Sequence, residues 1–145
     1  MGRMIGGVVL GYVVMAASVM VTYSIAYVLM GADGAFQPGS YRPTGVWLAV
    51  SFILAFIAAI AGGLTCTAVA RNPKGPMILA GAVVVLGLLF AIPVLTAQDA
   101  ASELRTSEVS NFEAMQKAKE PGWVALATPF VGVAGVLIGA RLKRG

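Results

Sequence analysis

Histidine is missing from this chain of 145 residues, and cysteine occurs once, as Cys66. Without histidine, haem ligation by imidazole, zinc catalysis with histidine ligands and imidazole acid–base chemistry are excluded. A lone cysteine cannot form a disulfide within the chain or supply a paired-cysteine metal site. We therefore expect neither a metal nor a cofactor.

Charge is scarce and unevenly placed. Charged residues make up 11% of the chain and hydrophobic residues 59%, whereas an average soluble domain is about 25% charged. Asp, Glu, Lys and Arg are absent from four runs, residues 4–30, 44–70, 76–98 and 121–140. Charges inside membrane helices mark proton relays and ion sites, and these runs contain no such signal.

Each of the four apolar runs is long enough to cross a bilayer. A spanning helix needs about 20 apolar residues, because the hydrocarbon layer is about 30 Å thick and each residue rises about 1.5 Å. The first run exceeds the 7–15 apolar residues typical of a signal peptide, which favours a retained span. We predict an all-α integral membrane protein, a four-helix bundle in one domain over residues 1–145, embedded in bilayer lipid. The expected spans are about residues 4–30, 46–70, 77–97 and 122–140.

Basic residues at the span ends predict the orientation. They lie before the first span, between the second and third, and after the fourth: Arg3, Arg71, Lys74, Arg141, Lys143 and Arg144. All these positions fall on one side of a four-span path, and short loops rich in Lys and Arg stay in the cytoplasm. We expect an inner (plasma) membrane protein with both termini cytoplasmic. Since the basic residues are not interleaved with aromatics, no nucleic-acid partner is expected.

Residues 99–120 form the one polar segment with an organised pattern. Ser110 and Glu113 have the spacing of a capping box, which predicts a short extracytoplasmic surface helix between the third and fourth spans. Two interpretations stay open, a solvated connector and a docking element for another membrane protein or a second copy. The candidate partner-binding residues are Glu103, Arg105, Glu108, Phe112, Glu113, Met115 and Lys117.

Small residues recur at every fourth position in the second and fourth runs. Helix backbones can approach closely along such stripes. Packing within the bundle and an oligomer interface both fit the pattern, which does not identify the helix that each stripe meets. The candidate helix-packing residues are Ala55, Ala59, Gly63, Gly135 and Gly139.

Hydroxyl side chains are concentrated in the first run. They either line a small-molecule pathway or make structural hydrogen bonds, at about 0.6 kcal/mol each. Pro93 and Pro129 lie inside the third and fourth runs, where proline bends a helix and thereby shapes a bundle or forms a gate. The candidate pathway-lining residues are Tyr12, Ser18, Thr22, Tyr23 and Tyr27.

Patterns of catalysis are missing as well. The chain has no glycine-rich phosphate loop, nucleophile elbow or carboxylate cluster, so we expect no enzymatic activity. The sequence favours a small multi-pass inner-membrane protein that serves as an accessory or scaffold subunit of a membrane complex. The alternative is a small transporter or channel subunit whose pathway follows the hydroxyl residues of the first span.

Overall fold

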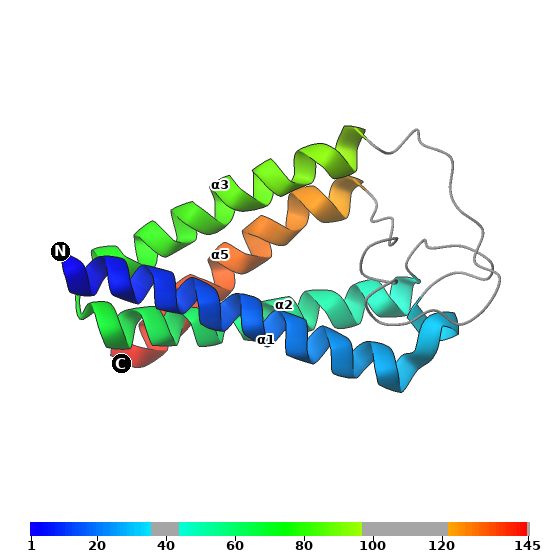
Figure 1. Cartoon of the computed structure of the whole chain (residues 1–145), viewed down its shortest axis with the longest axis horizontal. Helices are drawn as coiled ribbons and strands as arrows, with labels where there is room; N and C mark the ends of the chain where they lie inside the picture. Colours follow the sequence, from blue (N-terminus) through cyan, green and yellow to red (C-terminus); the bar gives the residue numbers. More distant parts are fainter. Residues whose placement is uncertain (36–43, 97–121, 145) are drawn as a thin grey trace.

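The computed structural model describes residues 1–35, 44–96 and 122–144, and within these ranges the chain forms helices and no strand (Figure 1). Four helices are long and apolar enough to span a membrane. The prediction of an all-helical chain with four apolar helices of spanning length is therefore confirmed for the described residues, and these helices are consistent with a multi-pass membrane protein. The predicted surface helix within residues 99–120 lies outside the described residues. The helices are α1 (Gly2–Ala35), α2 (Gly45–Ala70), α3 (Lys74–Thr96) and α5 (Gly122–Arg144).

The helices form two antiparallel hairpins that pack side by side (Figure 1). α1 packs on α2, α3 packs on α5, and α2 joins the hairpins by packing on α5. Within the described part of the chain, α1 and α5 do not meet. The order around the bundle is α1, α2, α5, α3, so α2 finds its main partners in α1 and α5 and not in α3, which directly follows it.

The end of α1 is tied to the start of α2. Gly31 has φ 73° and ψ 171°, a backbone conformation that favours glycine, and it interrupts the helix one turn before its end. The Thr44 hydroxyl accepts a hydrogen bond from the Trp47 backbone N–H at 3.1 Å and donates one to the Gly34 carbonyl at 2.7 Å. Thr44 therefore caps α2 and holds the last turn of α1 beside it.

A three-residue turn connects α2 to α3 at the opposite end of the bundle. Arg71 ends α2 in the left-handed conformation, with φ 50° and ψ 28°. The Asn72 side chain accepts a hydrogen bond from the Lys74 backbone N–H at 2.9 Å, which starts α3. Arg144 donates to the Pro73 carbonyl at 3.0 Å. The turn therefore lies beside the end of α5.

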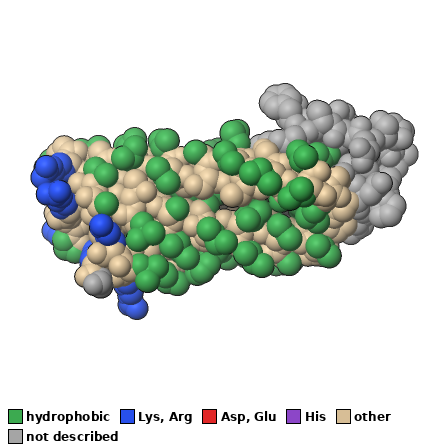
Figure 2. Space-filling model, turned by 90° about the horizontal axis from the view of Figure 1, so that it is seen from below, with side chains coloured by type: hydrophobic (Ala, Val, Ile, Leu, Met, Phe, Trp, Pro, Cys, Tyr) green, Lys and Arg blue, Asp and Glu red, His purple; other side chains and the backbone are tan. Residues whose placement is uncertain are grey.

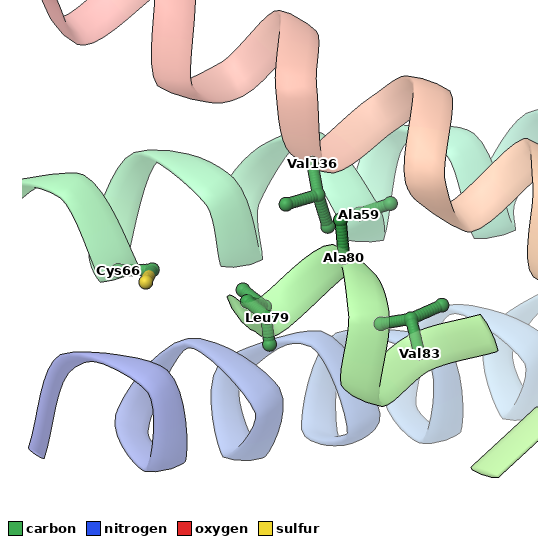
Figure 3. Packing of buried hydrophobic residues seen from close by; sticks show 6 residues of the cluster. All are labelled: Ala59, Cys66, Leu79, Ala80, Val83 and Val136. Carbon is green, nitrogen blue, oxygen red and sulfur yellow. The ribbon is translucent and has the colours of Figure 1, made fainter. Parts of the chain in front are cut away.

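The hydrophobic core occupies the half of the bundle nearer the start of α1 and the end of α5. Its members are mostly small, so the helices approach one another closely. Lipid tails are as apolar as leucine, and membrane helices are therefore held together by close van der Waals packing and hydrogen bonds. The core cluster draws on α2, α3 and α5 (Figure 3) and comprises Ala59, Cys66, Leu79, Ala80, Val83 and Val136.

Candidate functional site

One end of the bundle is strongly cationic. Figure 2 shows Lys and Arg side chains gathered at one end, with hydrophobic side chains over the coloured surface beyond them. This end combines the start of α1, the α2–α3 turn and the end of α5. The segments that form this end contain no acidic residue to balance the charge. The exposed basic residues are Arg3, Arg71, Lys74, Arg141, Lys143 and Arg144.

Small residues bring α2 and α5 into contact at the level of their backbones. A Cβ atom added to Gly135 would lie 2.5 Å from the Cβ of Ala59, and one added to Gly139 would meet the Ile60 carbonyl oxygen. The two stripes of small residues thus face each other inside one bundle. Their members are all buried: Ala55, Ala59, Gly63, Gly135 and Gly139.

Gly7 and Gly11 make a second close contact, between α1 and α2, which was not predicted from the sequence. A Cβ atom on Gly7 would lie 2.7 Å from the Cβ of Ala70, and one on Gly11 would lie 2.8 Å from the Cβ of Cys66. The spacing of four residues was the available signal, because it equals the spacing of the other stripes. The glycine contacts of α5 with α2 and of α1 with α2 together hold these three helices close to one another in the cationic half of the bundle.

A cavity of about 490 Å³ lies between the two hairpins, toward the half of the bundle away from the cationic end. All four helices line it, through selected residues within 12–23 of α1, 51–55 of α2, 83–91 of α3 and 124–132 of α5. On α1, Met15 and Val19 line the cavity, beyond the glycines that face α2. The volume falls in the range of about 300–1,000 Å³ that is typical of small-molecule sites.

The cavity wall is apolar apart from four hydroxyl residues, Tyr12, Tyr23, Ser51 and Thr128. The Tyr23 hydroxyl donates to the Ser51 carbonyl at 2.8 Å, which links α1 to α2. Ser51 and Thr128 donate to carbonyls of their own helices at 2.9 and 2.7 Å. Tyr12 makes no side-chain hydrogen bond within the described part of the chain. Most of the hydroxyl donors are therefore already used by the protein.

The candidate pathway-lining residues separate into two groups. Tyr12 and Tyr23 line the cavity, whereas Ser18, Thr22 and Tyr27 are not among its lining residues. Thr22 donates to the carbonyl oxygen of Ser18 at 2.6 Å, inside its own helix. Tyr27 is buried, and its ring meets that of Trp47 edge-on at a centroid distance of 6.3 Å.

The two prolines occupy different surroundings. Pro129 lies in the cavity wall, and a Cβ atom added to Gly87 of α3 would meet the Pro129 ring. Pro93 is exposed near the end of α3 and is not among the lining residues. Only Pro129 thus belongs to the contact between α3 and α5 at the cavity.

The candidate partner-binding residues, which fall within 103–117, lie outside the described residues. Within residues 1–35, 44–96 and 122–144, no group of three His, Cys, Asp or Glu side chains is placed to hold a metal ion. The chain has no match among protein-family models, curated proteins or solved structures. The described helices therefore indicate the class alone: four candidate spanning helices, consistent with a multi-pass membrane protein.

Proposed function

We propose that the protein resides in the cell's inner membrane with both termini in the cytoplasm, and that it serves as a non-enzymatic accessory or scaffold subunit of a membrane complex. The observation that carries the proposed orientation is the distribution of charge. Six exposed Lys and Arg residues lie at one end, and the four apolar runs contain no charged residue. The cationic end is the cytoplasmic one by the positive-inside rule.

The helix that offers a partner the most surface is α1. Only 11% of its spanning window is buried within the chain, compared with 44% for α5. Ile5, Val9 and Val13 of α1 are each more than half exposed. An uncharged helix face of this kind recognises the helices of a partner through packing, since no ion pair is available along it.

Orientation is tested by fusing a reporter to the C-terminus. A fluorescent protein that matures only in the cytoplasm is expected to be active there, and a phosphatase that is active only outside the cytoplasm is expected to be silent. The opposite pair of results contradicts the proposed orientation.

The subunit role is tested by purifying the full chain in native nanodiscs, followed by mass spectrometry at its native size. A stoichiometric membrane partner is expected. Val13→Trp, on the exposed face of α1, is expected to weaken co-purification, whereas Leu95→Trp, on the exposed face of α3, serves as the control. A protein that elutes without any partner contradicts the subunit role.

A transporter or channel subunit is the second candidate, and the cavity that Tyr12 and Tyr23 line favours it. A pathway without charge would have to use hydroxyl and carbonyl groups. Solute or ion flux into proteoliposomes containing the protein alone is the measurement that distinguishes this role. Flux that Tyr23→Phe reduces would favour transport over the accessory role.

A further inference from the structure

We propose that the cavity between the two hairpins holds one acyl chain of a bilayer phospholipid, which reaches it sideways between α1 and α3. The proposal rests on the membrane location in the proposed function. It depends neither on the orientation of the protein nor on a partner.

The chemistry of the wall suits hydrocarbon. Fourteen of the eighteen lining residues are apolar or glycine, and no lining residue is charged. Three of the four lining hydroxyls donate to protein carbonyls. A buried water needs about two to four polar partners, and an ion needs several carbonyls or a charged group. A wall that provides few such groups favours an apolar occupant.

The length of the cavity matches one leaflet of a bilayer. Tyr12 and Tyr23 mark its extent along α1, and at a rise of about 1.5 Å per residue they are separated by about 16 Å. Half of the hydrocarbon layer measures about 15 Å, since the whole layer is about 30 Å thick. An acyl chain from the leaflet away from the cationic end would run along the cavity with its headgroup at the membrane surface.

The cavity reaches the outside of the bundle between α1 and α3. Met20 of α1 and Phe90 of α3 both line the cavity, and they are 60% and 68% exposed. Figure 1 shows α1 and α3 diverging away from the end that carries the termini. On the opposite side, the rings of Phe52 and Trp123 close the contact between α2 and α5 at a centroid distance of 6.1 Å. The open side therefore faces lipid.

The test uses the full-length protein in vesicles of phosphatidylethanolamine and phosphatidylglycerol, extracted in mild detergent for native mass spectrometry. One retained phospholipid per chain is expected. Ala16 lines the cavity from an exposed position, so Ala16→Phe is expected to lower retention at least tenfold. Ala17 is exposed and does not line the cavity, so Ala17→Phe is the matched control and should retain lipid as the unmodified protein does.

A second measurement needs no variant. A phospholipid with a photoreactive group in its acyl chain is expected to label Ala91 or Val124, which line the cavity and are each 2% exposed. Bulk lipid cannot reach these side chains from outside the bundle. Labelling confined to exposed residues, or equal lipid retention in Ala16→Phe and Ala17→Phe, overturns the proposal.

Tyr12→Phe distinguishes an acyl chain from a free amphiphile whose polar end reaches the Tyr12 hydroxyl. For an acyl chain, retention is expected to stay unchanged, and a tenfold loss overturns the proposal in favour of the amphiphile. Protection of the buried Cys66 thiol from maleimide confirms that each variant is folded. A protein with no partner, or with the opposite orientation, would contradict the proposed function and leave these results intact.

Discussion

Gly63 of α2 lies against the carbonyl oxygen of Val136 in α5, so closely that no side chain fits between the two residues. Val136 is completely buried in the core cluster. In a bilayer, where burying apolar groups against one another gains little over burying them in lipid, contact at this range stabilises a helix pair through dispersion. The contact between the two hairpins therefore requires a residue without a side chain at position 63.

Gly63→Ala tests this contact between α2 and α5. The added methyl group would require the Val136 backbone to move, and overpacking of this kind costs about 1–3 kcal/mol. The unfolding midpoint in mixed micelles of rising SDS content should fall. Gly81→Ala is the control, since a Cβ atom at Gly81 meets nothing within 4 Å and alanine favours a helix by about 1 kcal/mol over glycine. Equal midpoints for the two variants would contradict the close approach of α2 and α5.

Thr44→Ala tests the link between α1 and α2. The variant loses both the cap on the Trp47 N–H and the hydrogen bond to the Gly34 carbonyl, and loss of an N-cap costs about 0.5–2 kcal/mol. Hydrogen exchange of the Trp47 amide should accelerate. Thr44→Ser keeps the hydroxyl and should exchange at a rate near that of the unmodified protein. An unchanged rate in Thr44→Ala would mean that the cap is dispensable.

Tyr23→Phe removes the hydrogen bond to the Ser51 carbonyl and retains the ring beside Trp47, at a centroid distance of 6.0 Å. Hydrogen bonds between membrane helices average about 0.6 kcal/mol, so a small loss in the SDS unfolding midpoint is expected. Tyr12→Phe is the matched control, because Tyr12 makes no side-chain hydrogen bond in the described ranges of the chain. If Tyr12→Phe lowered the SDS unfolding midpoint more than Tyr23→Phe, the stabilising hydrogen bond would not be the one that Tyr23 donates.

Cys66 should behave as an internal reporter of folding. Its side chain is completely buried, so a maleimide should react with it only after the bundle opens locally or unfolds. In detergent, the native protein is expected to stay unlabelled and the protein in excess SDS to take one label. Lys74→Cys, at an exposed position, should add one label to each state. Rapid labelling of the native, unmodified protein would contradict the packing around Cys66.

The spans were predictable because length and hydrophobicity are properties of each segment alone. The helix ends differ from the apolar runs because hydrogen bonds determine them. α3 starts at Lys74, before the expected start at about 77, where Asn72 caps it. α1 continues past residue 30 to Ala35, and its last turn is held by Thr44. Caps extend a helix into sequence that hydropathy does not mark as a span.

Helix order was not predictable, because a stripe of small residues carries no information on its partner. The short turn at residues 71–73 suggests α2 and α3 as principal neighbours, whereas α2 packs mainly on α1 and α5. The cavity follows from that order, since all four helices contribute to its wall. Tyr12 and Tyr23 were recognisable as hydroxyl residues of the first span. Ser51 and Thr128 carried no distinguishing signal within their own runs.

The order of the helices around the bundle has a consequence for biosynthesis. The ribosome delivers α5 to the membrane after the other three helices, yet α5 is the principal neighbour of α3 and one of the two principal neighbours of α2. Membrane helices insert first and associate afterwards. Until the 23 residues of α5 are inserted, the side of α2 that carries Ala59 and Gly63 faces lipid, and α3 has only its weaker contacts with α1 and α2. The nascent chain is therefore expected to pass through a stage of three inserted and incompletely assembled helices.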